Sequence, residues 1–486
     1  MGLSKLQQAA EFIKTNDLVQ AERLYKDILI SQPDCGQAFL GMGLIALKVE
    51  KFDNAVSFLI KSCELLPNEI LPLIRLSEAF NGVNSESDAL VALEFASKTF
   101  PNNAVVNYHL GLQYTILGQL DKAEFSFKSV IDFTHEPITS FALFELTRLD
   151  SHPEQYLTIL KKRLKQAKAA SIELTVLHYA LGNVLDSTQK YQQAWQHFES
   201  ANFLQAKLCK FKTTELIRFF QDIKTTATSN VLAKRRRLTQ HNLLTEVVPI
   251  FIIGLPRTGS TLLEHLLTEH QDISSAGEVP YLSREVAKFL FGQSKLHYPY
   301  SMADMTDEQL NTAAQIYLEK LSAHAEGNRY VIDKLPANFQ SLGLIYKLFP
   351  NAKVIHIKRN LPDVALSVYR NYFSQSEPYF CSLIEFKQYH ALYSDLMEHW
   401  NTKLPGFSHD VSYEQLVADK TNTIKNILDL CGLPSEINMS NGYQTNKVVK
   451  TLSNIQVRRA ISTKPIQHWH NYKKHMQIFK EHEPLD

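Results

Sequence analysis

The chain has 486 residues, of which 44% are hydrophobic and 21% charged, and its formal net charge is +1. This length exceeds what one hydrophobic core normally serves, so we expect at least two domains. The near-neutral charge argues against a general nucleic-acid-binding protein.

The compartment is predicted from what the sequence lacks. Its apolar runs are shorter than the roughly 18 residues of a membrane span, and the N-terminal segment has no apolar signal-peptide core. The five cysteines are scattered and form no CxxC pair, which suits a reducing compartment and predicts no metal cluster. We therefore expect a cytoplasmic protein without a membrane span or a bound metal.

The N-terminal half carries an internal repeat. Pro33, Pro67 and Pro101 are spaced by 34 residues, which is the period of tetratricopeptide repeats. Small residues such as Gly111 and Gly182 recur at matching positions between large apolar ones, so that two antiparallel helices can approach closely. The pattern predicts an α-solenoid over residues 1–228, with a degenerate repeat or irregular helical pair near 137–170, and then a linker over 229–246.

A strand, a loop and a helix are predicted in that order at the start of the C-terminal domain, residues 247–486. An apolar, β-branched run from Val247 to Ile253 is typical of a strand buried on both faces. The loop GLPRTGST follows, and then leucines at helical spacing. Unpaired N–H groups in the first helical turn make such a junction an anion site.

The loop departs from the P-loop pattern GxxxxGK[ST] because position 260, where the lysine belongs, is serine. An arginine with neighbouring hydroxyl groups can still hold one tetrahedral anion. The candidate anion ligands are Arg257, Thr258, Gly259, Ser260 and Thr261.

The segments PRTGSTLLE and HQDISSAGE resemble the 5′-phosphosulfate loop of the sulfotransferases, particularly the tyrosylprotein sulfotransferase branch. That family uses 3′-phosphoadenosine-5′-phosphosulfate (PAPS) as sulfuryl donor and leaves 3′,5′-bisphosphoadenosine. The resemblance extends to about Tyr472, so it implies an α/β domain with a mostly parallel central sheet. Ala276 stands where lumenal relatives carry a disulfide cysteine, which again favours a cytoplasmic relative.

Two charged residues are candidates for the chemistry. Glu278 stands where the family has its general base, and a carboxylate there can take the proton of an acceptor hydroxyl; His265 and His270 are alternative bases. Lys334 ends a short strand and matches a family lysine beside the sulfuryl group, where it can stabilise charge on the bridging oxygen. A rival interpretation is a Walker-B-like strand in which Asp333 holds Mg²⁺.

The remaining motifs concern the rest of the nucleotide. Arg359, at the end of a buried strand, and Ser367, eight residues later, match the family's 3′-phosphate motif. Tyr413 follows another strand and resembles a tyrosine near the nucleotide. Thr451–Arg459 and Pro465–Tyr472 resemble the part of the family that closes over the nucleotide, and Ser453 is the candidate contact to its phosphate end. His356 is expected to be a core histidine.

These motifs together predict a PAPS-dependent sulfotransferase that needs no metal. The acceptor is a hydroxyl group of a peptide tyrosine, a carbohydrate or a small alcohol, and the repeats dock either an acceptor, such as a protein or peptide, or a separate partner. A Mg²⁺-dependent P-loop kinase and a scaffold with an inactive transferase domain are the alternatives.

Overall fold

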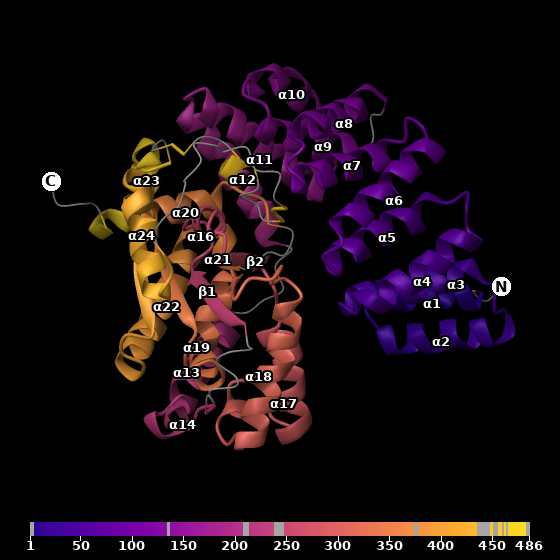
Figure 1. Ribbon diagram of the computed structural model, residues 1–486. Helices are drawn as coiled ribbons and strands as arrows, with labels where there is room; N and C mark the ends of the chain where they lie inside the picture. Colours follow the sequence, from indigo (N-terminus) through magenta and orange to yellow (C-terminus); the bar gives the residue numbers. More distant parts are fainter. Residues whose placement is uncertain are drawn as a thin grey trace. The chain divides into compact units, whose positions relative to one another are not determined.

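The computed structural model describes residues 4–482 apart from 134–136, 208–212, 238–246, 374–377, 435–447, 451–454, 459–460 and 463–464. The chain divides into two compact units (Figure 1). The first comprises Met1–Lys165 with Asn446–Val449, and the second comprises Gln166–Thr445 with Lys450–Asp486. The domain boundaries expected from the sequence, at residues 228 and 247, stay a prediction.

The first unit is a row of antiparallel helix pairs, which confirms the predicted tetratricopeptide solenoid (Figure 1). Its helices are α1 (Lys5–Lys14), α2 (Leu18–Ser31), α3 (Gly36–Lys48), α4 (Phe52–Leu65), α5 (Ile70–Gly82), α6 (Glu86–Thr99), α7 (Ala104–Ile116), α8 (Leu120–Phe133), α9 (Pro137–Leu149) and α10 (Leu157–Gln166). The 3₁₀ turn η1 (Pro153–Tyr156) separates α9 from α10, so the segment without the repeat's small residues is a helical pair that a 3₁₀ turn interrupts.

The small residues of the repeat allow the helices of a pair to touch. A methyl group on Gly111 of α7 would lie 2.5 Å from the Phe127 ring of α8, well inside van der Waals contact. The pair α11 (Ile172–Ser187) and α12 (Tyr191–Ala206) repeats this contact between Gly182 and Phe198, at 2.4 Å. This pair therefore continues the repeat packing, although it belongs to the second unit.

The second unit is built on a five-stranded sheet, and all strand pairs among the described residues are parallel. The strands are β1 (Val248–Gly254), β2 (Ile273–Gly277), β3 (Tyr330–Asp333), β4 (Lys353–Lys358) and β5 (Ser408–Ser412), in the spatial order β2-β3-β1-β4-β5. Ile250 of central β1 is in register with Ile332 of β3 and with Lys353 of β4. The mostly parallel sheet predicted from the sequence is confirmed.

Helices cover both faces of this sheet, which is why β1 is apolar at every position. On one face, Ile250 and Ile252 pack with α16 (Ser260–Leu267) and α24 (Lys420–Cys431) in one buried cluster. On the other face, the Phe251 ring packs beside that of Tyr317 of α18 (Asp307–Ser322), with ring centroids 5.9 Å apart. The alternation of β1 side chains between two covered faces holds its C-terminal end in a fixed place.

The other elements surround this core. They are α13 (Thr213–Thr226), α14 (Ser229–Ala233), η2 (Leu282–Val286), α17 (Ala287–Ser294), η3 (Tyr300–Met302), η4 (Pro336–Ser341), α19 (Leu342–Leu348), α20 (Leu361–Tyr369), α21 (Pro378–Cys381), α22 (Leu383–Lys403), α23 (Tyr413–Ala418), η5 (Gln456–Arg458), η6 (His468–Tyr472) and η7 (Gln477–His482). Across the described ranges, no helix is both long enough and apolar enough to cross a membrane.

Candidate active site at the carboxyl ends of the strands

The predicted site residues follow the carboxyl ends of the five strands. The loop containing Arg257 follows β1, Glu278 follows β2, Lys334 follows β3, Arg359 follows β4 and Tyr413 follows β5. In a parallel sheet these ends meet at one edge, where ligands of open α/β folds bind. The fold therefore gathers at one edge motifs that are spread over more than 150 residues of the sequence.

The loop after β1 has a left-handed backbone at two positions. Arg257 has φ 68° and Gly259 has φ 98°, and α16 begins directly afterwards at Ser260. A methyl group on Gly259 would lie 2.3 Å from the Tyr413 ring, so glycine is required both by its backbone angle and by this contact. Thr258 donates to the Leu255 carbonyl at 2.8 Å, and its hydroxyl group shapes the loop.

Two arginines and a serine form one polar cluster beside this loop. Arg257 Nε donates to Ser367 Oγ at 3.1 Å, while Arg359 donates to the Arg257 carbonyl at 3.0 Å and to the Pro465 carbonyl at 2.7 Å. The Arg359 guanidinium lies 4.5 Å from the Tyr413 ring centroid, and its buried Nε has no hydrogen-bond partner in the described structure. A buried, unsatisfied N–H on a cation is suited to an anionic ligand.

A buried lysine lies between two carboxylates at the neighbouring strand ends. The Lys334 side chain is 0% exposed, and its Nζ contacts Glu278 Oε1 at 2.6 Å and Glu264 Oε2 at 3.6 Å. Glu264 also accepts a hydrogen bond from Ser275 at 2.6 Å, and burial raises the pKa of its carboxyl group. Glu278 differs because 41% of its side chain is exposed. Its carboxylate is therefore accessible to solvent, whereas the Lys334 side chain is not.

Asp333 is less suited to holding a metal than its strand position suggests. Its side chain is fully buried, and its two oxygens accept hydrogen bonds from Tyr317 at 2.7 Å and Asn338 at 3.0 Å. Burial raises the pKa of Asp333 to about 7. A carboxyl group that is held in this way offers no open oxygen to a cation, so the geometry gives the Walker-B-like interpretation little support.

The histidines weighed as alternative bases are buried. His270 contacts the Pro434 carbonyl through Nε2 at 3.1 Å and accepts from the Asp272 amide through Nδ1 at 3.2 Å. His265 lies in the buried face of α16. Glu278 is thus the more exposed of the candidate bases. The predicted ligand Ser453 lies outside the described residues.

A cavity of about 350 Å³ adjoins the loop and the end of β4, with Thr258 and Arg359 in its wall. His356 also lines it. This mid-strand side chain contacts Tyr393 and donates from Nδ1 to the Asp410 carboxylate at 2.8 Å. The hydrogen bond from His356 holds the pKa of Asp410 down to about 2. His356 is 2% exposed, as expected of a core histidine.

Sequence reasoning missed three carboxylates near the site: Glu264, Asp363 and Asp186. Glu264 lies in α16 beside leucines, where it looks like an ordinary helix residue. Asp363 accepts hydrogen bonds from the Gln467 and Trp469 amides at 2.7 and 3.1 Å. Asp186 lies in α11 and contacts residues nearly 300 positions away in the sequence. What distinguishes these three carboxylates is their burial, and the local sequence around each of them does not show it.

Comparison with known proteins agrees with this architecture. A family model described as the sulfotransferase family matches residues 249–436. An uncharacterised protein of Aquifex aeolicus is 27% identical over 403 residues, which are 81% of this chain and 52% of that protein. Protein-tyrosine sulfotransferase 1 of Danio rerio is 27% identical over 237 residues, or 45% of this chain and 65% of that enzyme. The chain thus spans about half to two thirds of the length of these relatives.

Among solved structures, a thermophilic TPR protein of Thermus thermophilus is similar over 40% of this chain and 97% of its own, with 23% identity and a TM-score of 0.31. The fold is a parallel α/β domain joined to tetratricopeptide-like helix pairs. Residues 249–436 therefore match the sulfotransferase family, and tetratricopeptide-like helix pairs precede them in the chain.

Proposed function

We propose that this protein transfers a sulfuryl group from PAPS to an acceptor hydroxyl and releases 3′,5′-bisphosphoadenosine. One observation carries the proposal. At one edge of the sheet lie the Arg257–Ser367 pair, which is suited to binding an anion, and the exposed Glu278 carboxylate, which contacts the buried Lys334. A donor with a 5′-phosphosulfate and a 3′-phosphate needs two cationic contacts, and an acceptor hydroxyl needs a base. Both requirements have candidate residues here.

The two arginines are assigned to the two ends of the donor. Arg257, with the amide groups at the start of α16, is assigned to the 5′-phosphosulfate. Arg359 and Ser367 are assigned to the 3′-phosphate, and the unsatisfied Nε of Arg359 supports this assignment. Tyr413 lies under the Arg359 guanidinium and is assigned to the nucleotide.

Glu278 and Lys334 are assigned to the transfer step. The acceptor oxygen forms a bond to sulfur while the bond from sulfur to the bridging phosphate oxygen breaks, and the acceptor proton passes to Glu278. The Lys334 ammonium stabilises the negative charge that grows on the bridging oxygen. The 2.6 Å contact between these two side chains supports a shared role, because protonation of Glu278 weakens its hold on Lys334.

The acceptor class is a peptide tyrosine, a carbohydrate or a small alcohol. The similarity to protein-tyrosine sulfotransferases favours testing tyrosine peptides first. Solenoids of this kind present extended binding surfaces, and we assign the helix pairs of the first unit to docking of the acceptor or of a separate partner protein.

Titration calorimetry tests the donor assignment. The protein should bind 3′,5′-bisphosphoadenosine without metal, and more tightly than it binds ATP with Mg²⁺. The same preparation should then consume PAPS in the presence of a tyrosine peptide or another hydroxyl acceptor. Tighter binding of Mg²⁺-ATP, with no binding of bisphosphoadenosine, would replace this proposal with the kinase alternative. Binding without transfer to any acceptor class would favour an inactive scaffold.

A further inference from the structure

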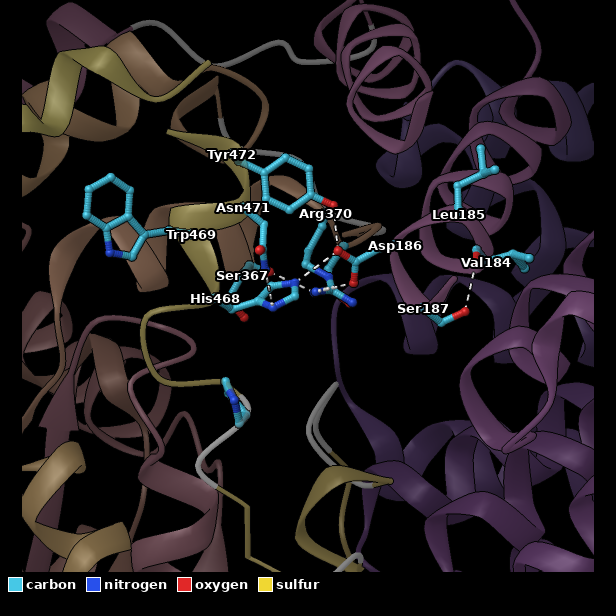
Figure 2. Close-up of polar contacts among 12 residues, drawn as sticks. Val184, Leu185, Asp186, Ser187, Ser367, Arg370, His468, Trp469, Asn471 and Tyr472 are labelled. Atoms are coloured by element: carbon cyan, nitrogen blue, oxygen red, sulfur yellow. Dashed lines mark hydrogen bonds and ion pairs between the residues drawn. The ribbon is translucent and has the colours of Figure 1, made fainter. Parts of the chain in front are cut away.

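Asp186, near the end of α11, is a buried carboxylate with three partners from the C-terminal part of the second unit. Its Oδ1 accepts hydrogen bonds from Tyr472 at 2.5 Å and His468 at 2.9 Å, and its Oδ2 contacts Arg370 at 2.9 Å (Figure 2). Only 7% of Asp186 is exposed. Burial alone would raise the pKa of this carboxyl, but Arg370, His468 and Tyr472 together hold it below its usual range. The carboxylate is therefore a charged junction of α11, α20 and η6.

The partner helix α12 holds the same end of α20. Asn202 donates to the Tyr369 carbonyl and Gln205 to the Phe373 carbonyl, each at 2.7 Å. The ring of Trp195 stacks on that of Tyr369, with centroids 5.1 Å apart. The last turn of α20, which contains the proposed 3′-phosphate ligand Ser367, is thus held against α11 and α12.

The other end of α20 holds the closing segment, defined here as Pro465–Tyr472. Asp363, in the first turn of α20, accepts from two backbone amides of this segment. Arg359 donates to the Pro465 carbonyl. The closing segment is therefore anchored at its start by the proposed 3′-phosphate arginine and at its end by Asp186.

The position of Asp186 in its repeat shows that this junction is not a general feature of the solenoid. Asp186 stands four residues after Gly182, and the matching positions of three other repeats are Leu47, Asn81 and Thr115. These three are neutral, and a buried carboxylate at a packing position is costly unless it is paired. The charge occurs in the one of these four helix pairs that belongs to the second unit.

We propose that Asp186 is a positioning residue for the nucleotide, so that the helix pair α11–α12 supports the donor site. Asp186 contacts no proposed ligand of the donor directly. It holds the closing segment and the end of α20, and these in turn hold Arg359 and Ser367 in place for the 3′-phosphate. The inference rests on the proposed function, because it takes the 3′-phosphate assignment of those two residues as given.

Calorimetry of two nucleotides tests this role. Asp186→Asn keeps the side-chain shape but removes the charge, so it should weaken bisphosphoadenosine binding by about tenfold or more. Binding of adenosine 5′-phosphate, which lacks the 3′-phosphate, should change by less than about threefold. Tyr472→Phe, which removes one donor and keeps the ring, should produce a smaller change in the same direction. Glu199→Gln, an exposed carboxylate of α12, is the matched control and should bind both nucleotides normally.

Hydrogen exchange supplies a second measurement. Backbone amides of the closing segment should exchange faster in Asp186→Asn than in the unmodified protein or in Glu199→Gln. Unchanged selectivity between the two nucleotides in a folded Asp186→Asn protein would overturn the inference, as would equal weakening of both. If Asp186→Asn does not fold, the same criteria apply to Tyr472→Phe. An unmodified protein that binds neither nucleotide would instead contradict the proposed function itself.

Discussion

The side chain of Arg257 donates a hydrogen bond to Ser367 across 3.1 Å, although 110 residues separate them in the sequence. The loop after β1 and the helix after β4 therefore share one polar cluster, because β1 and β4 are hydrogen-bonded neighbours in the sheet. If these residues hold the two ends of one nucleotide, Arg257 exchanges this contact for a phosphate oxygen when the donor binds. Binding at the two ends of the nucleotide is then coupled through a single side chain.

Arg359 should distinguish nucleotides that carry a 3′-phosphate. Arg359→Ala removes a charge-assisted contact worth about 1.5–3 kcal/mol, so bisphosphoadenosine should bind roughly ten- to a hundredfold more weakly. Adenosine 5′-phosphate should bind almost as before. Lys358→Ala is a fitting control, since this neighbouring cation pairs with Asp410. Titration calorimetry measures all of these affinities, and equal losses for both nucleotides would rule out the 3′-phosphate assignment.

Sulfuryl transfer should not require a divalent cation. Arg257, Arg359 and Lys334 supply the positive charge that a metal supplies in P-loop kinases, and position 260 carries serine in place of the lysine. Release of bisphosphoadenosine from PAPS should proceed at the same rate with excess EDTA and with Mg²⁺. An EDTA-sensitive reaction that Mg²⁺ restores would return Asp333 to consideration as a metal ligand.

Local patterns predicted the strands and the loop well because their information is contiguous. The run from Val247 to Ile253 is apolar on both faces, and the structure buries both faces of β1. The repeat glycines predicted helix pairs because close approach depends on one residue of each helix. The contact between Lys334 and Glu278 joins two separate motifs across 56 positions, and only the family resemblance had associated them.

The parts that could not be predicted depend on tertiary burial. Glu264 and Asp186 have unremarkable helical neighbours in the sequence, yet each is enclosed by elements far along the chain. Periodicity assigns a residue to a face of its own helix and does not identify what covers that face. The division of the chain after Lys165 likewise depends on which helices pack together, whereas the repeat pattern continues through α12.

Asp333 should make the protein less stable as the pH rises toward neutrality. In the folded protein its pKa is raised to about 7, whereas in an unfolded chain it lies near 4. Between these values the folded state holds a proton that the unfolded state has lost. Each pH unit in this window then lowers the free energy of unfolding by up to about 1.4 kcal/mol, and the effect ends above about pH 7.

Asp333→Asn removes this titration. Urea unfolding of the second unit, followed at several pH values from 5 to 8, should show a flatter pH dependence for Asp333→Asn than for the unmodified protein. Parallel curves for the unmodified protein and Asp333→Asn would show that the buried carboxyl does not titrate in this range.

Glu278 and Glu264 contact the same lysine, yet their substitution should have different consequences. Glu278→Gln keeps the size of the side chain but cannot accept a proton, so turnover should fall by roughly 10²–10⁴-fold while bisphosphoadenosine affinity stays nearly unchanged. Arg257→Ala should instead impair both quantities, because the guanidinium is assigned to the donor before and during transfer. Steady-state rates and calorimetry on the same preparations separate the two patterns.

Glu264→Gln is the matched variant, since it removes the other carboxylate beside Lys334 and leaves the proposed base in place. Turnover should fall less than in Glu278→Gln, because the proposed base is still present to accept the acceptor proton. If Glu278→Gln retains near-normal turnover on the true acceptor while Glu264→Gln abolishes it, the base is Glu264. If both variants stay active, the proton is accepted elsewhere, and His270 becomes the next residue to replace.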